Sequence, residues 1–258
     1  MQTNFRKTDF IPQPKASADV NKKIVIAVDG PAASGKGTLA KKLASRLGYA
    51  YLDTGSLYRA VGMATLETGG NPESWSDVQT AVQIITRNLT PELLASPALR
   101  TPQVAEAASK VAAIPEVRQA LLDYQRAFAA NPPGNVGGAV LDGRDIGTVI
   151  CPQADVKFFV TASVEERARR RFEELKATSP DKGAILSQSQ VLADLKRRDE
   201  RDQTRTAAPA KAAADAYVMD TTTLNAQQAL DQAISVIRAK FLSETNDNGL
   251  APRKPPQP

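Results

Sequence analysis

The residues best suited to chemistry form a glycine-rich loop, Gly30-Pro-Ala-Ala-Ser-Gly35-Lys36-Gly37-Thr38, directly after a short β-branched run. Glycines let a backbone turn tightly, so that successive N–H groups face one anion. A helix that begins at the end of the loop adds the positive end of its dipole. Lys36 supplies a mobile charge for β- and γ-phosphates, and Thr38 supplies a hydroxyl for Mg²⁺. The loop therefore predicts a nucleoside triphosphate site.

The loop departs from the generic phosphate-binding pattern at one position. The generic loop has Ser or Thr directly after its lysine, whereas here Gly37 intervenes and the hydroxyl comes one residue later. The GKGT order resembles that of nucleoside monophosphate kinases. The alternative is a strand-to-helix turn that carries a lysine by chance. The strand before the loop and the helical pattern after it favour the phosphate loop.

A second polar group follows the next predicted strand, in Asp53-Thr-Gly-Ser-Leu-Tyr58-Arg59. Arg59 can bind a phosphate through two N–H groups at once, and Thr54 and Tyr58 can add hydrogen bonds. Packing of Tyr58 and Arg59 on the protein surface is the alternative, because both side chains have a long apolar body.

A third polar group, Leu141-Asp142-Gly-Arg144-Asp145-Ile-Gly-Thr148, follows another predicted strand. The carboxyl ends of parallel strands meet at one edge of a sheet, where ligands bind. We therefore expect Asp142, Arg144 and Asp145 to face the phosphate loop. A charged loop with only a structural role is the alternative.

Alternating strands and helices must position these groups. Short apolar runs at 24–28, 49–52, 139–141, 156–160 and 217–219 predict strands. Apolar residues recur every three or four positions within 37–47, 104–111, 117–128, 164–175 and 230–241, which indicates helices. This alternation predicts an α/β fold with a parallel sheet and helices on both faces.

Composition narrows the chemistry. The 258 residues include no histidine and a single cysteine, Cys151. These counts exclude Ser-His-Asp and Cys-His nucleophiles, histidine general bases, HExxH zinc sites, CxxC motifs and internal disulfides. Lys and Arg number 33 against 28 Asp and Glu, a formal charge of +5. No apolar run reaches the ~18–20 residues of a membrane span, and no apolar signal core opens the chain. We therefore expect a cytoplasmic protein with no membrane partner.

Basic residues gather within 167–205, which holds eleven basic and seven acidic side chains. Ser163-Val-Glu-Glu166 predicts a capping box at the start of a helix. We expect four arginines to project from the faces that its apolar stripe leaves free: Arg167, Arg169, Arg170 and Arg171. In the next helix, one face should carry Arg198, Asp202 and Arg205. The arginines can close over phosphates as a lid, or they can be solvated and paired with neighbouring acids.

With these motifs in order, the sequence resembles the bacterial cytidylate kinase family. The matching stretches, between about Ile24 and Ile237, are VDGPAASGKGT, YLDTGSLYR, RTPQVAEAASKVAAIPEVRQALLDYQRAF, LDGRDIGTVICPQADVKFFVTASVEERARRR and LKRRDERDQTRTAAPAKAAADAYVMDTT. The resemblance implies a P-loop nucleoside monophosphate kinase fold, with a five-stranded parallel sheet flanked by helices, a monophosphate-binding insert and a small lid. It also implies Mg²⁺-dependent transfer of the γ-phosphoryl group of ATP to CMP or dCMP, in pyrimidine nucleotide metabolism.

The resemblance further assigns roles to residues. ATP would be held by Gly30, Pro31, Ala32, Ala33, Ser34, Gly35, Lys36, Gly37 and Thr38, and Mg²⁺ by Thr38 and Asp142. The CMP phosphate would be held by Thr54, Tyr58, Arg59 and Arg144, cytosine by Ser109, Arg118 and Asp145, and the sugar by Arg198 and Asp202. The catalytic group would be Lys36 and Arg144 with the lid and flanking arginines Arg170, Arg171 and Arg205.

The likeness is weakest in residues 66–100. Family members commonly carry antiparallel strands there, whereas this stretch predicts a helix around Trp75 to Ile85 and no strand alternation. We expect a shortened insert at 66–100 and a lid at 169–189, within a kinase domain spanning 24–242. Residues 1–23 and 243–258 are expected to be disordered extensions.

Other functions stay open. UMP or AMP could replace CMP as the acceptor, or the chain could be a nucleotide-binding regulatory module without catalysis. RGG or aromatic-basic repeats would indicate an RNA-associated module, and the sequence contains no such repeats. We therefore expect small-molecule substrates, no nucleic-acid partner and a monomer.

Overall fold

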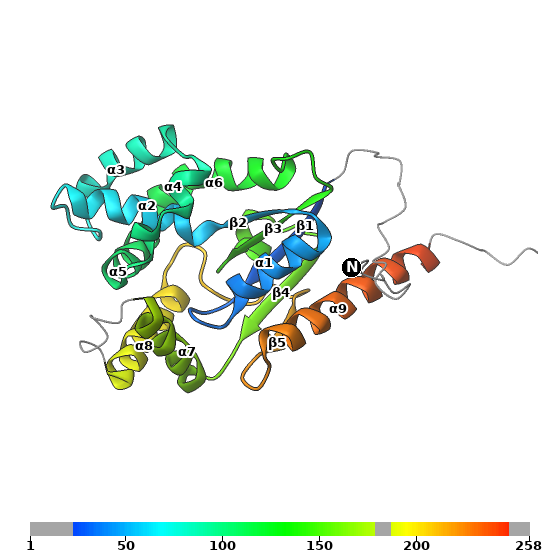
Figure 1. Cartoon of the computed structure of the whole chain (residues 1–258). Helices are drawn as coiled ribbons and strands as arrows, with labels where there is room; N and C mark the ends of the chain where they lie inside the picture. Colours follow the sequence, from blue (N-terminus) through cyan, green and yellow to red (C-terminus); the bar gives the residue numbers. More distant parts are fainter. Residues whose placement is uncertain (1–22, 179–186, 248–258) are drawn as a thin grey trace, which may run out of the picture.

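The computed structural model describes residues 23–178 and 187–247, and within them five parallel strands form one sheet in the order β2-β3-β1-β4-β5 (Figure 1). The strands are β1 (Ile24–Asp29), β2 (Ala50–Asp53), β3 (Gly138–Gly143), β4 (Val156–Thr161) and β5 (Tyr217–Asp220). Each strand overlaps a run of residues for which the sequence predicts a strand. The predicted α/β fold with a five-stranded parallel sheet flanked by helices is confirmed.

Helices connect successive strands and cover both faces of the sheet. They are α1 (Lys36–Leu47), α2 (Thr54–Glu67), α3 (Trp75–Arg87), α4 (Pro91–Ala95), the 3₁₀ helix η2 (Pro97–Arg100), α5 (Pro102–Val111), α6 (Pro115–Ala130), the π-helix η3 (Ile146–Ile150), α7 (Val164–Thr178), α8 (Gln188–Thr204) and α9 (Ala226–Asp247). Figure 1 shows α1 and α9 side by side along the sheet. Among the described residues, no helix has both the length and the apolar character needed to cross a bilayer.

The central strand β1 explains why its sequence is a continuous apolar run. Ile26 and Val28 pack with α1 and α9 on one face, while Ala27 packs with Ala129 of α6 and Ile150 of η3 on the other. A strand buried on both faces needs apolar residues at every position rather than at alternate ones. The phosphate loop therefore follows the buried middle strand of the sheet.

Helices α2 to α6 form a helical layer beside the sheet (Figure 1). Their shared core includes Leu57, Val61, Val78, Val104 and Leu121, all buried. Residues 66–100 contain the end of α2 and the helices α3, α4 and η2, with no strand. The helix predicted around Trp75 to Ile85 is α3. This layer carries the side chains of α2, α5 and α6 to the carboxyl edge of the sheet.

Helices α7 and α8 pack against the phosphate loop. Their small apolar cluster consists of Ala32, Ala168, Val191 and Leu195. Arg167 is buried here and does not project from a free face, so that expectation is wrong. Its guanidinium donates to Asp199 Oδ2 at 2.6 Å and to the Ala32 carbonyl at 3.2 Å. The reason is that α8 covers this face of α7.

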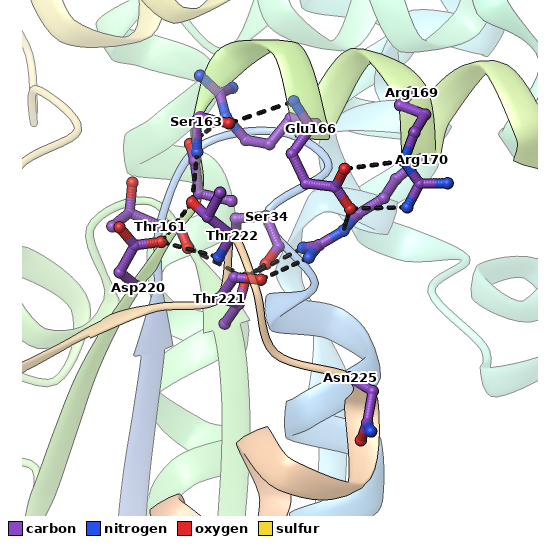
Figure 2. A network of polar contacts seen from close by, with 12 residues as sticks. Ser34, Thr161, Ser163, Glu166, Arg169, Arg170, Asp220, Thr221, Thr222 and Asn225 are labelled. Atoms are coloured by element: carbon purple, nitrogen blue, oxygen red, sulfur yellow. Dashed lines mark hydrogen bonds and ion pairs between the residues drawn. The ribbon is translucent and has the colours of Figure 1, made fainter.

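The predicted capping box at Ser163 is present only in part. The Ser163 Oγ accepts from the Glu166 N–H at 3.3 Å. The Glu166 carboxylate accepts from Arg169 and Arg170 rather than from the Ser163 N–H, which donates to Thr222 Oγ1 at 2.9 Å (Figure 2). The arginines compete successfully for the carboxylate because a hydrogen bond between two charged groups is stronger.

Some domain boundaries fall outside the described residues. Positions 1–22 of the predicted extension 1–23, positions 248–258 of the predicted extension 243–258, and positions 179–186 of the predicted lid 169–189 lie there. The last helix, α9, continues to Asp247, five residues beyond the expected end of the kinase domain at 242.

Gly30 gives a prediction about stability. Its φ is +147°, and a Cβ at this position would lie 2.0 Å from the Val160 carbonyl oxygen. We expect Gly30→Ala to lower the free energy of unfolding by at least about 3 kcal/mol, since backbone atoms cannot move away as side chains can. Gly48→Ala is the matched control, because Gly48 also has a positive φ of +66° but faces open space. Urea denaturation should give a loss of only about 1–2 kcal/mol for the control; equal losses would contradict the packing argument.

Candidate active site

The phosphate loop runs from the end of β1 to the start of α1 and lines a cleft of about 520 Å³. Gly35 has a φ of +86°, a left-handed conformation that glycine adopts without strain. The Lys36 Nζ lies 3.5 Å from the Pro31 carbonyl, so the side chain folds back over the loop. The N-terminus of α1 therefore opens into the cleft, as an anion site requires.

The wall of the cleft is strongly cationic. Eight lysine or arginine side chains and three carboxylates line it. Five of the arginines are ones that the sequence analysis selected: Arg59, Arg144, Arg170, Arg171 and Arg198. They come from α2, the loop after β3, α7 and α8, so distant segments converge on one space. Such an excess of positive charge in a cleft attracts and binds phosphate groups.

Lys36 and Asp142 form the electrostatic centre of the cleft. Burial and the positive charge of Arg144 lower the pKa of Lys36 to about 7. Burial and the nearby carboxylate of Asp53 raise the pKa of Asp142 to about 6, although Lys36 acts against this shift. The Tyr51 hydroxyl donates to Asp142 Oδ2 and fixes the carboxylate. Burial is the largest cause of both pKa shifts, and each of the two groups partly offsets the shift of the other.

Oxygen ligands suitable for Mg²⁺ lie beside the loop. A Cβ at Gly37 would be 3.4 Å from Asp142 Oδ2, so this carboxylate lies directly against the start of α1. Thr38 is exposed in the first turn of the same helix. Mg²⁺ prefers oxygen ligands and is often held by one or two protein groups together with substrate phosphates and water. The donor set of Thr38 and Asp142 fits that requirement.

The lowered pKa of Lys36 gives a prediction about proton uptake. At pH 8 the lysine is mostly neutral in the free protein, because its pKa is about 7. Phosphate charge raises that pKa, so binding of a nucleoside triphosphate should take up protons from the buffer. We expect titration calorimetry at pH 8 in two buffers with different ionisation enthalpies to report net uptake, and the Lys36→Met variant to lose it. The same uptake in that variant would assign the protons to another group.

A second group of predicted residues gathers beside the cleft, where α5, α6 and α8 meet the loop after β3. Asp145 accepts from Arg118, and Arg205 Nη2 lies 3.4 Å from the other oxygen of its carboxylate. The Arg118 guanidinium also lies 5.5 Å from the centre of the Tyr58 ring. Arg205 therefore lies beside Asp145 and does not line the phosphate cleft with Arg170 and Arg171.

The third group forms a chain of hydrogen bonds through Asp202. Asp202 Oδ1 accepts from Ser109 Oγ at 3.3 Å, and Asp202 Oδ2 accepts from Arg144 Nε at 3.0 Å. Arg198 Nε lies 4.0 Å from the same oxygen. Positive neighbours, led by Arg144, hold the pKa of Asp202 below its usual value even though its burial acts in the opposite direction. The carboxylate is thus ionised and joins α5, α8 and the loop after β3.

Two predicted phosphate ligands of α2 have structural partners as well. Thr54 Oγ1 donates to the Asp142 carbonyl at 2.8 Å, and Arg59 Nη1 donates to the Leu99 carbonyl at 3.0 Å. Thr54 and Tyr58 are buried, whereas Arg59 lines the cleft. The structure thus gathers the residues that the sequence selected around one cleft and its margin.

Sequence reasoning missed several residues with roles at this site. Asp29 is buried and accepts from the Ile146 and Gly147 N–H groups, both at 2.8 Å, which fixes the loop after β3 to the end of β1. Tyr51 holds Asp142, and Thr221 contacts the phosphate loop. An acidic residue that ends a buried strand directly before a glycine could have signalled Asp29. No local pattern signals the other two, since their partners are distant in sequence.

The fold and the cleft define a P-loop nucleotide-binding protein of the α/β class. A sequence model described as cytidylate kinase matches residues 26–239. Three similar proteins are each named cytidylate kinase. One from Paramagnetospirillum magneticum is 56% identical over 216 residues, which cover 84% of this chain and 98% of that protein. One from Rhodospirillum rubrum is 53% identical (84% and 98% covered), and one from Granulibacter bethesdensis is 52% identical (85% and 99% covered). The chain belongs to the cytidylate kinase family.

Proposed function

We propose that this protein transfers the γ-phosphoryl group of ATP to CMP or dCMP, giving ADP and CDP or dCDP. One observation carries the proposal. A phosphate loop faces an arginine-lined cleft, and at the margin of that cleft a buried carboxylate, Asp145, lies between Arg118 and Arg205. The loop and the arginine-lined cleft suit a triphosphate and a monophosphate, and the Asp145 carboxylate suits a base with a hydrogen-bond donor. Membership of the cytidylate kinase family supports the same reaction.

In this proposal the donor nucleotide occupies the phosphate loop. The backbone of residues 30–38 accommodates the phosphates of ATP, and the Lys36 ammonium neutralises charge on the β- and γ-phosphates. Thr38 and Asp142 would hold Mg²⁺, which would supply positive charge against the negative charge of the phosphates. Lys36 must be protonated for this role, and the phosphate charge itself raises its pKa.

The acceptor nucleotide binds across the cleft with its phosphate toward Arg59 of α2 and Arg144 of the loop after β3, which both line the cleft. Thr54 and Tyr58 lie in the N-terminal part of α2, as Arg59 does. Arginine suits this task because its planar guanidinium can donate two parallel hydrogen bonds to one phosphate. Arg198 and Asp202 of α8 then lie where they can bind the sugar hydroxyls.

In this proposal, base selection follows from the hydrogen-bonding groups that Asp145 presents. Cytosine has an amino donor at N4 beside acceptors at N3 and O2, whereas uracil has an acceptor at position 4. An ionised carboxylate can only accept, so Asp145 can bind the N4 amino group and repels the O4 of uracil. Arg118 and Ser109 can donate to the remaining acceptors. The guanidinium groups of Arg118 and Arg205 both contact the Asp145 carboxyl group.

The chemical step requires position and charge rather than a covalent intermediate. Phosphoryl transfer proceeds through a loose transition state in which the equatorial oxygens carry the negative charge. Arg170 and Arg171 line the cleft beside the loop and are the arginines suited to stabilise that charge. Arg205, also expected to be catalytic, would act from its contact with Asp145. The absence of histidine is compatible with this chemistry, since no step requires it as a base.

The remaining parts of the proposal concern architecture and cell biology. We propose that 66–100 is a shortened monophosphate-binding insert and that 169–189 acts as a lid that excludes water from the cleft. A monomeric state and a cytoplasmic location stay predictions.

The decisive experiment is an assay that couples ADP release to a visible signal, with ATP and one monophosphate at a time. We expect turnover with CMP and dCMP and much slower turnover with UMP and AMP. Fastest turnover with UMP or AMP would replace the acceptor in the proposal. ATP binding without turnover of any monophosphate would favour a nucleotide-binding module over a kinase.

A further inference from the structure

The guanidinium of Arg170 is held by a network that reaches beyond its own helix (Figure 2). Its Nε donates to Glu166 Oε1 at 2.9 Å, one turn back along α7. Its Nη1 donates to the Thr221 hydroxyl at 3.0 Å, and its Nη2 donates to the Thr221 carbonyl. Both terminal nitrogens of Arg170 are therefore oriented by a single residue in the connection between β5 and α9.

The held guanidinium lies at the phosphate loop. A Cβ on Gly35 would be 3.7 Å from Arg170 Nη1, and Arg170 lines the same cleft as Lys36 and Thr38. An arginine has five N–H donors in a fixed plane. The three bonds described above leave one N–H on each terminal nitrogen. Because the plane is fixed at three points, these two donors keep one orientation beside the loop.

The direction of the Thr221 hydroxyl follows from its other neighbours. The Thr221 side chain is buried, and its Oγ1 lies 2.9 Å from the Ser34 carbonyl and 3.1 Å from the Thr161 carbonyl. The Thr161 carbonyl already accepts from the Thr221 N–H at 2.8 Å. A hydroxyl has only one hydrogen, so the closer carbonyl of Ser34 receives it and the oxygen lone pairs remain for Arg170.

Thr221 thus connects two elements of the site. Its hydroxyl donates to the backbone of the phosphate loop, immediately before Gly35, and accepts from Arg170 of α7. The loop and the arginine are thereby fixed relative to each other, although they are separated by more than a hundred residues in sequence. A preorganised donor stabilises transition-state charge better than one that must first be oriented.

We propose that Thr221 is a positioning residue for phosphoryl transfer, which fixes the Arg170 guanidinium against the phosphate loop. This inference rests on the proposed kinase activity. Thr221 itself does not touch the reacting atoms in this role; it acts through Arg170. Its removal therefore affects the chemical step more than the binding of either nucleotide.

Three variants separate positioning from simple stability. Thr221→Val has nearly the same shape but loses the hydroxyl, and Thr221→Ser retains it. Thr222→Val is the matched control, because Thr222 is the next residue and also accepts and donates through its hydroxyl. Its partners are Ser163 and Asp220 rather than Arg170 or the phosphate loop (Figure 2).

The kinetic expectation is a split between kcat and KM. Thr221→Val should lower kcat roughly 10- to 100-fold, the effect of losing a hydrogen bond to a charged group. The KM values for ATP and CMP should change less than about threefold, since the lost interaction acts mainly in the transition state. Thr221→Ser and Thr222→Val should keep kcat close to that of the parent. A loss of kcat in Thr222→Val equal to that in Thr221→Val would overturn the proposal.

A double mutant tests whether the effect passes through Arg170. In an Arg170→Ala background, Thr221→Val should change kcat by less than about twofold, because coupled residues are not additive. A full additional loss would show that Thr221 acts on the loop alone and would overturn the proposal.

A measurement without turnover separates this inference from the kinase assignment. In the parent protein the Arg170 guanidinium should rotate slowly, because three hydrogen bonds hold it. Side-chain ¹⁵N NMR of the full chain should therefore show separate Arg170 Nη signals, which are assigned by their absence in Arg170→Lys. We expect the same signals in Thr221→Ser and Thr222→Val and rotational averaging in Thr221→Val. Averaged signals in the parent would refute the positioning, whereas resolved signals in a parent that phosphorylates no monophosphate would refute only the kinase assignment.

Discussion

Replacement of Lys36 by alanine should lower kcat by about 10³-fold while the protein stays folded. The loss of a single preorganised charge or hydrogen-bond donor typically lowers kcat by two to three orders of magnitude. The Lys36 Nζ lies 3.5 Å from the Pro31 carbonyl of the phosphate loop, closer to the loop backbone than the other cations that line the cleft are shown to lie. Stability should change little, since burial already lowers the pKa of this lysine and opposes its charged form. Steady-state ADP release and thermal unfolding measure the two effects.

Lys42→Ala is the matched control for Lys36→Ala. Lys42 lies on the same helix, α1, but is exposed and does not line the cleft. It should keep both kcat and stability. If Lys36→Ala retained a rate within tenfold of the parent, the assignment of the phosphate loop as the ATP site would be wrong.

Replacement of Asp145 by asparagine should reduce the preference for CMP over UMP by roughly 10²-fold, measured as the ratio of the two kcat/KM values. The amide can present either its oxygen or its NH₂ group to the base, whereas the carboxylate only accepts. The change also removes the anion between Arg118 and Arg205, and a buried pair that loses one partner is strongly destabilised. The kcat/KM for CMP should therefore fall as well.

Asp199→Asn controls for the general effect of breaking a buried ion pair. Asp199 pairs with Arg167 at 2.6 Å, and the two side chains are 12% and 8% exposed. Asp145 and Arg118 are buried to a similar extent, with 5% and 10% exposed. This variant should lose stability but keep the ratio of kcat/KM for CMP and UMP. An unchanged ratio in Asp145→Asn, or an equal change in Asp199→Asn, would remove Asp145 from base recognition.

The parts of the fold that the sequence predicted depend on local patterns. The buried run Ile24–Asp29, the glycines after it and the four-residue apolar spacing in Lys36–Leu47 specify a strand, a loop and a helix without reference to the rest of the chain. The helix around Trp75 to Ile85 was equally visible, but the short helices α4 and η2 that follow it were not predicted. The five strands correspond to five local apolar runs, whereas no local pattern indicates the strand order β2-β3-β1-β4-β5.

The unpredicted parts depend on partners that are distant in sequence. Glu166 has the residue type and spacing of a capping box, yet two arginines bind its carboxylate. Arg167 has the polarity of a surface residue, yet α8 buries it. Asp29, Tyr51 and Thr221 act on loops that lie 90 to almost 190 positions away in the chain. A single sequence contains no signal for such contacts until tertiary packing is known.

The carboxylate of Asp29 has a consequence for how nucleotides bind. Asp29 immediately precedes Gly30 of the phosphate loop, and its two acceptor bonds go to Ile146 and Gly147, directly after Asp145. The segments proposed for the donor and the acceptor are thereby joined at their bases into one rigid unit. The conformational entropy of fixing these two segments relative to each other is lost when the chain folds, not when a nucleotide binds. The relative position of the two phosphate groups is therefore a property that the enzyme acquires during folding.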